Sequence, residues 1–140
     1  MDVNTAGESA DTDVDAVVIG AGFSGLYMLH KLRKQGLDVR VYEKGDEVGG
    51  TWYWNRYPGA RCDSESHIYC YSFDGDLHEE WEWSERYPEQ PEILEYLQWV
   101  ADRLDLRRNI AFEREVTSAT YDESSDTWSV EMADGERVST

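Results

Sequence analysis

The sequence is poor in cysteine and has no long apolar run. Its 140 residues include two cysteines, Cys62 and Cys70, which we interpret as reduced thiols because nothing nearby suggests a secreted protein. Their spacing does not suit a metal ion, so we expect no metal site. No stretch approaches the roughly 18 consecutive apolar residues of a transmembrane helix, so we expect no membrane-spanning segment.

Positive charge is also scarce. Thirteen basic residues stand against 30 acidic ones, and the formal net charge of −17 argues against nucleic acid or an anionic membrane as a partner. Only three basic residues are lysines, a composition typical of a cytoplasm kept at high salt, where self-repulsion is screened. We therefore favour a halophilic, cytoplasmic protein over an ordinary acidic one. Residues 1–14 carry no positive charge, which excludes the basic start of a signal peptide and predicts a disordered acidic tail.

A glycine-rich turn stands between a predicted strand and a predicted helix. The strand, at residues 16–19, is short and β-branched, as in a strand buried on both faces. It leads into Gly20-Ala21-Gly22-Phe23-Ser24-Gly25, a G-x-G-x-x-G pattern that is followed by helical spacing of leucines. Gly20 suits the tight turn, Gly22 a close approach to a pyrophosphate, and Gly25 close packing of the helix. The helix start would favour the negative charge of a diphosphate.

An acidic residue stands where such a unit binds a ribose. The second predicted strand, residues 39–42, is followed by Glu43, which lies 18 residues after Gly25. A carboxylate there would accept hydrogen bonds from the ribose hydroxyls and repel a 2′-phosphate, which favours FAD or NAD over NADP. The alternative is a βαβ unit whose glycines only reverse the chain, but it leaves the glycine spacing and Glu43 unexplained.

The remaining chain predicts further α/β structure. Residues 44–61 are interpreted as a loop, and the aromatic-rich residues 62–88 as irregular structure or short helical turns that cover the sheet edge. A helix is predicted at about 90–106, with Pro91 in its first turn and with Arg107 and Arg108 at its end. Residues 110–112 would add a parallel strand. A β-meander follows, with strands at 116–122, 127–132 and 137–138.

Aromatic residues and a paired Arg and Asp follow the second strand. Gly49-Gly50-Thr51-Trp52 and then Trp54 could wall a flat ring system, and Arg61-Cys62-Asp63 comes after a Tyr-Pro-Gly turn. An Arg beside an Asp in an aromatic pocket suits a flavin edge or a nicotinamide. Paired tryptophans are more often packing residues, however, and an adjacent Arg and Asp are more often solvated or a structural ion pair.

The run GGTWYWNRYPGARCDSESHIYCYSF resembles the Baeyer–Villiger monooxygenases, and so do GAGFSGLY, WEWSERYPEQPEILEYLQWVADRLDLRR and VTSATYDE. The resemblance covers roughly residues 14–132. The resemblance implies an α/β, Rossmann-like FAD-binding domain with a parallel sheet and a β-meander at residues 15–140. It implies that FAD is bound by Gly20, Gly22, Phe23, Ser24, Gly25, Glu43, Thr51, Trp52, Tyr53, Trp54, Arg61, Cys62, Asp63, Tyr69 and, through its backbone at the adenine, Val116.

The same resemblance implies an activity. In such enzymes NADPH reduces the flavin, which reacts with O2, and one oxygen atom is inserted into a ketone to give an ester or lactone. Asp63 would contact FAD and orient an arginine from a later part of the chain, which makes it the candidate catalytic residue. Small ketones and O2 are thus the expected partners.

The sequence also departs from the family. The aromatic-x-Gly-x-x-x-His-x-x-x-Trp fingerprint is absent, as are a second G-x-G-x-x-G for NADPH, the later arginine and a strand to complete the FAD sheet. We therefore interpret the domain as incomplete at its C-terminal end and do not expect catalysis from these residues alone. Three alternatives stay open: another flavin monooxygenase that hydroxylates nitrogen, a non-catalytic nucleotide-binding module, and an acidic structural domain with no ligand.

Overall fold

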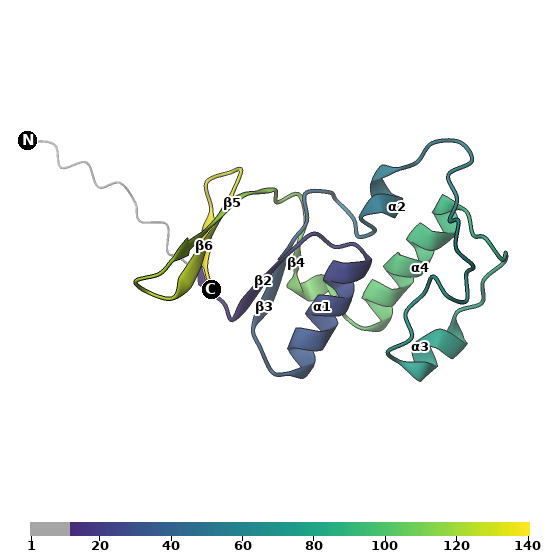
Figure 1. Cartoon of the computed structure of the whole chain (residues 1–140), viewed down its shortest axis with the longest axis horizontal. Coiled ribbons are helices and arrows are strands. Elements are labelled where there is room, and N and C mark those ends of the chain that lie inside the picture. Colours follow the sequence, from purple (N-terminus) through teal and green to yellow (C-terminus); the bar gives the residue numbers. More distant parts are fainter. Residues whose placement is uncertain (1–11) are drawn as a thin grey trace, which may run out of the picture.

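The computed structural model describes residues 12–140, so most of the expected acidic tail lies outside the described residues. The described chain forms three layers (Figure 1). A mostly antiparallel sheet lies at one end, a small parallel sheet in the middle, and the helices pack on the other side of that parallel sheet. None of the helices formed by these residues is both long enough and apolar enough to cross a membrane.

The predicted βαβ unit is confirmed. Strand β2 (Ala16–Ile19) leads through the glycine turn into helix α1 (Phe23–Lys34), and strand β3 (Val39–Tyr42) returns parallel to β2. Helix and strand approach closely at Gly25, where a Cβ atom would lie 1.9 Å from the carbonyl oxygen of Gly20. Only a glycine fits there without displacing backbone.

Strand β4 (Ile110–Ala111) completes the parallel sheet in the order β2-β3-β4. It pairs with β3 in parallel, with Val41 opposite Ile110. This confirms the parallel strand predicted at residues 110–112, although Phe112 lies outside it. Since β3 is the central strand, its carboxyl end, where Glu43 follows, lies in the middle of the sheet edge.

The predicted meander is also confirmed. Strands β5 (Val116–Asp122), β6 (Thr127–Met132) and β7 (Arg137–Ser139) pair antiparallel in sequence order. The structure differs from the prediction at the tail. Strand β1 (Thr12–Asp13) pairs in parallel with β7, and Val14 donates a backbone hydrogen bond to the carbonyl of Ser139 at 3.1 Å. Because Val14 is also buried, the ordered domain begins before residue 15.

Two separate cores form because side chains alternate along the parallel strands. On one face, Val39 and Val41 pack with residues of α1 and of the helices beyond it. On the other face, Val17 and Tyr42 pack against the inner face of the meander, where Val130, Met132 and Val138 are buried. The meander is thereby attached directly to the strand that carries Glu43.

The predicted loop at residues 44–61 contains one helical turn, α2 (Thr51–Trp54), so that interpretation was wrong at this point. A four-residue turn is too short to show a helical period in the sequence. It begins after Gly50, whose φ of 54° lies in the left-handed region. Another short helix, α3 (Gly75–Glu80), lies within the segment expected to hold short helical turns.

Helix α4 (Gln90–Arg103) carries Pro91 in its first turn, as predicted, but ends earlier than residue 106. Asp105 has a positive φ of 51°, and a 3₁₀ turn, η1 (Arg107–Asn109), follows. Arg107 and Arg108 therefore lie in this 3₁₀ turn and not at the end of the helix itself. Arg107 instead bridges the Asp102 carboxylate at 2.5 Å and the Glu47 carboxylate at 2.6 Å. It thus connects the end of α4 to the turn that precedes α2.

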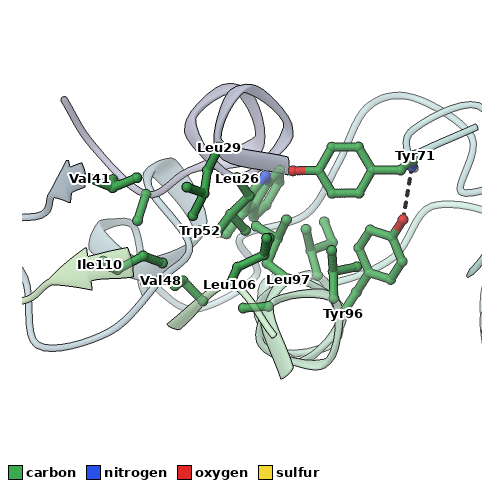
Figure 2. Packing of buried hydrophobic residues seen from close by; sticks show 14 of the residues in the cluster. Leu26, Leu29, Val41, Val48, Trp52, Tyr71, Tyr96, Leu97, Leu106 and Ile110 are labelled. Carbon is green, nitrogen blue, oxygen red and sulfur yellow. Dashed lines mark hydrogen bonds between the residues drawn. The ribbon is translucent and has the colours of Figure 1, made fainter. Parts of the chain in front are cut away.

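A pair of buried tyrosines joins the aromatic segment to the main core (Figure 2). The Tyr96 hydroxyl, on α4, accepts a hydrogen bond from the backbone N–H of Tyr71 at 2.8 Å. The Tyr71 hydroxyl in turn donates to the carbonyl of Phe23 at 2.5 Å. Burial raises the pKa of Tyr96 to about 12.

We predict that Tyr96→Phe lowers the free energy of unfolding by about 1–3 kcal/mol, because the buried N–H of Tyr71 loses its acceptor. The matched control is Tyr121→Phe, since Tyr121 is 44% exposed and its change should cost less than about 0.5 kcal/mol. Denaturant unfolding measures both. Because the pKa of Tyr96 is raised in the folded state, the neutral hydroxyl contributes fully to stability below pH 10.0, and this contribution declines as the pH rises toward about 12. Between these pH values, the stability of Tyr96→Phe should therefore depend less on pH than that of the unsubstituted chain. Equal losses for both variants would contradict the role of this hydroxyl.

We also predict that Gly25→Ala destabilises the fold by about 1–3 kcal/mol or more, because its Cβ would overlap backbone that cannot move aside. The matched control is Gly75→Ala at the start of α3, where a Cβ would meet nothing within 4 Å. That change should be neutral or stabilise by up to about 1 kcal/mol. Thermal or denaturant unfolding measures the stability of both variants. Equal stability of Gly25→Ala and Gly75→Ala would contradict the prediction.

Candidate functional site

The buried carboxylate of Glu43 connects the end of β3 to the glycine turn. The side chain is 4% exposed, and one carboxylate oxygen accepts a hydrogen bond from the backbone N–H of Ala21 at 2.8 Å. The other oxygen accepts from the N–H of Gly45 at 2.7 Å. Each carboxylate oxygen has room for more than one donor, so the group can accept further hydrogen bonds from a ligand.

Glu43 and the glycine turn line one cavity. The cavity has a volume of about 430 Å³ and lies at the carboxyl ends of β2 and β3. The segment that leads into β5 forms another wall of this cavity. It is held beside β3 because the backbone N–H of Arg114 donates to the carbonyl of Glu43 at 2.9 Å. The cavity is lined by Ile19, Gly20, Ala21, Gly22, Tyr42, Glu43, Lys44, Gly50, Thr51, Trp54, Arg114, Glu115 and Val116.

The start of α1 faces this region without a side-chain cap. Gly22 is the N-cap residue, it offers no side-chain acceptor, and the first turn contains no acidic residue. The N–H groups of this turn and the positive end of the helix dipole therefore remain available to an anion. This arrangement suits the diphosphate of a nucleotide.

The pair Gly49-Gly50 lies against the glycine turn. The N–H of Gly49 donates to the carbonyl of Ala21 at 2.9 Å. A Cβ on Gly22 would lie 3.3 Å from the Cα of Gly50, and one on Gly50 would lie 2.9 Å from the Cα of Gly22. Side chains at either position would fill the narrow space over the helix start.

A second cavity, of about 300 Å³, adjoins the first and shares Ile19, Gly20, Gly22 and Thr51 with it. The indole N–H of Trp52 donates to the Tyr69 hydroxyl at 3.1 Å beside this cavity. The structure thus brings Thr51, Trp52 and Tyr69, three of the residues predicted to bind FAD, together with the glycine turn. The second cavity is lined by Ile19, Gly20, Gly22, Phe23, Ser24, Gly25, Gly49, Thr51, Trp52 and Tyr69.

Trp54 and Tyr53 lie differently from Trp52. Trp54 lines the first cavity, on the Glu43 side, and not the second. Tyr53 lines neither cavity, and its hydroxyl donates to Asp46 at 2.5 Å. The run Thr51–Trp54 therefore divides between the two cavities because successive residues of one helical turn point in different directions.

Arg61, Cys62 and Asp63 line neither cavity. The Arg61 guanidinium pairs with the carboxylates of Glu85 at 2.7 Å and Glu89 at 2.6 Å. Cys62 is buried, and Asp63 is exposed. Their roles toward flavin and nicotinamide stay predictions. Within residues 12–140, no group of three His, Cys, Asp or Glu side chains could hold a metal ion.

Several lining residues were missed by the sequence reasoning. Ile19, 61% exposed at the end of β2, lines both cavities. Lys44 and Arg114 line the first cavity, and both also line a neighbouring cavity of about 480 Å³ that extends toward Met132 and Asp134. Lys44 could have been found by its place directly after Glu43. Nothing in the sequence signalled Arg114, which reaches the site through the pairing of distant strands.

The chemistry of these walls fits an FAD molecule. Its ribose would meet a carboxylate acceptor at Glu43, its diphosphate a helix start at Gly22, and its ring system the aromatic walls of Trp52 and Tyr69. The narrow contact between Gly22 and Gly50 leaves backbone rather than side chains beside the diphosphate. The donor and acceptor set therefore suits a dinucleotide.

Comparisons with known proteins agree with this geometry. Residues 18–81 match the NAD(P)-binding Rossmann-like domain family. The chain is 58% identical over 91% of its length to an acetone monooxygenase (methyl acetate-forming) of Gordonia sp. strain TY-5, covering 24% of that protein. It is 54% identical over 94% of its length to a Baeyer–Villiger monooxygenase of Pseudooceanicola batsensis, again covering 24%. A phenazine N-monooxygenase of Lysobacter antibioticus is 52% identical over 89% of the chain, which covers 23% of it.

Solved structures give the same result. An oxidized steroid monooxygenase bound to NADP superposes with a TM-score of 0.90 at 58% identity, over 91% of this chain and 25% of that one. Cyclohexanone monooxygenase from Rhodococcus sp. Phi1 bound to NADP+ superposes with a TM-score of 0.91 at 55% identity, over 94% of this chain and 25% of that one. The chain spans about a quarter of the length of these relatives. In sequence and in fold, the chain is therefore similar to about a quarter of these monooxygenases, and its residues 18–81 match a Rossmann-like nucleotide-binding domain.

Proposed function

We propose that this chain binds FAD through the adenosine diphosphate half of the cofactor. The single observation that carries the proposal is the Glu43 carboxylate, which is buried at the end of β3 and bonded to the N–H of Ala21 in the glycine turn. An acceptor of this kind, placed beside an uncapped helix start in one cavity, suits a ribose followed by a diphosphate.

The two cavities suggest how FAD would lie. The ribose would bind at Glu43, the diphosphate at the backbone of Gly22, and the adenine toward Val116 and the meander. The flavin would extend toward Trp52 and Tyr69 in the second cavity. When bound, FAD supplies the redox chemistry, and these residues of the chain bind it, orient it and restrict the access of water to it.

We further propose that the activity served is that of an NADPH-dependent flavin monooxygenase that converts ketones and O2 into esters or lactones. The relatives named for acetone and cyclohexanone monooxygenation support this reaction class. A second candidate is oxidation at nitrogen, because the phenazine N-monooxygenase is less similar to this chain than the acetone monooxygenase but more similar than the cyclohexanone 1,2-monooxygenase. Product analysis of an enzyme that contains this chain, with a ketone and with a phenazine offered separately, distinguishes the two.

We predict that the chain binds FAD, measured by the change in flavin fluorescence on titration, and that ADP competes for the same site. Riboflavin, which lacks the adenosine diphosphate half, should compete much less well than ADP. FAD binding that riboflavin displaces and ADP does not would contradict the placement of the ribose and diphosphate. No FAD binding at all would contradict the proposed function.

The role of Glu43 is tested with paired ligands. We predict that the unsubstituted chain binds ADP about tenfold or more tightly than 2′,3′-dideoxy-ADP, because the charged carboxylate accepts hydrogen bonds from the ribose hydroxyls. In Glu43→Gln this preference should largely disappear. Isothermal titration calorimetry measures the four affinities, and any general effect of the substitution on the fold changes both ligands equally.

The control for charge is Glu113→Gln, which removes a carboxylate from the neighbouring cavity. This variant should keep the preference for ADP over the dideoxy ligand. If Glu43→Gln also kept it, Glu43 would be a structural residue that only joins β3 to the glycine turn.

A further inference from the structure

The walls of the proposed nucleotide site carry an excess of negative charge. The cavity of about 430 Å³ that Glu43 lines and the neighbouring cavity of about 480 Å³ have four carboxylates in their walls, Glu43, Glu113, Glu115 and Asp134. They have two cations, Lys44 and Arg114. The whole chain carries a formal net charge of −17. An anionic diphosphate therefore approaches a site that repels it, unless a nearby cation offsets the repulsion.

Arg114 is already neutralised by its neighbours. Its guanidinium pairs with the carboxylate of Asp134 and lies 3.1 Å from that of Glu136, both in the turn between β6 and β7. These carboxylates compete with any ligand for the same cation. Arg114 therefore contributes little net attraction for an anion.

Lys44 is the other cation and is held differently. Its ammonium lies over the ring of Trp54, 5.1 Å from the ring centroid. Lys44 and Trp54 both line the cavity of about 430 Å³ and the neighbouring cavity of about 480 Å³. Within residues 12–140 its ammonium forms no ion pair with a carboxylate. The ring of Trp54, on α2, thus holds the positive charge of Lys44 beside the cavity that Glu43 and Gly22 line.

We propose that Lys44, held over Trp54, is the residue that allows this acidic site to select ligands carrying a diphosphate. It acts through its charge, which attracts the diphosphate over several ångströms and offsets the surrounding carboxylates. The inference rests on the proposed function and deepens it. It concerns a residue that neither the glycine pattern nor Glu43 accounts for.

The chain offers a matched control for Lys44. Lys31, on α1, also lies over an aromatic ring, 6.0 Å from the centroid of Tyr27, and lines none of the cavities beside β3. Lys44→Gln and Lys31→Gln remove the same charge and the same kind of contact. The two variants therefore differ only in where the charge is lost.

We predict that Lys44→Gln weakens binding of FAD and of ADP by about threefold to tenfold at about 20 mM salt, and that Lys31→Gln changes either by less than about twofold. The difference should shrink at about 500 mM salt, where the Debye length falls to a few ångströms. Lys44→Arg, which keeps the charge, should restore the affinity. Fluorescence titration with FAD and calorimetry with ADP give the dissociation constants.

Three results would overturn the inference while the unsubstituted chain still binds FAD. They are equal losses in Lys44→Gln and Lys31→Gln, a loss in Lys44→Gln that persists undiminished at high salt, and a failure of Lys44→Arg to restore binding. The last two would show that Lys44 acts by packing on Trp54 rather than by charge. If the unsubstituted chain bound neither FAD nor ADP, the proposed function itself would fail.

Discussion

The structure depends on one buried contact, the hydrogen bond from the backbone N–H of Ala21 to the carboxylate of Glu43. A buried carboxylate without hydrogen-bond partners is costly, and this bond and the one from the N–H of Gly45 supply partners to Glu43, which is 4% exposed. In return, they join the glycine turn after β2 to the end of β3. The same geometry that satisfies the carboxylate also places it in the cavity where a ribose would bind.

Close backbone packing supports this contact from both sides. Gly25 lets α1 lie against the turn at Gly20, and Gly50 lets the segment before α2 lie against Gly22. Arg107, which lies far along the chain, forms an ion pair with Glu47 and so holds the segment before α2 in place. The second core attaches the meander to β3 through Tyr42, so Val116 also lies near the carboxyl end of that strand. The site is thus shaped by rigid elements rather than by one loop.

The acidic composition of the chain also affects which cations are available at the cavity beside Glu43. Most carboxylates of the described chain are exposed, and several form surface pairs with arginine, such as those of Arg61 and Arg103. Such pairs add little stability individually, because solvent screens them. They do, however, occupy the few cations that the chain possesses. A nucleotide site in such a protein depends on a cation left free, and Lys44 over Trp54 provides one.

The sequence by itself determined the βαβ unit, the meander and the position of Glu43 at the end of the strand beside the glycine turn, because each rests on local patterns: β-branched strands, glycine spacing and turn residues. The long run around residues 49–73 was also enough to indicate the family. The tertiary structure alone decided that Trp54 lines the same cavity as Glu43, that Arg107 binds Glu47 near the glycine pair, and that Thr12–Asp13 adds a strand beside β7. These features arise from contacts between residues far apart in the chain, and such contacts leave no periodic signal along it.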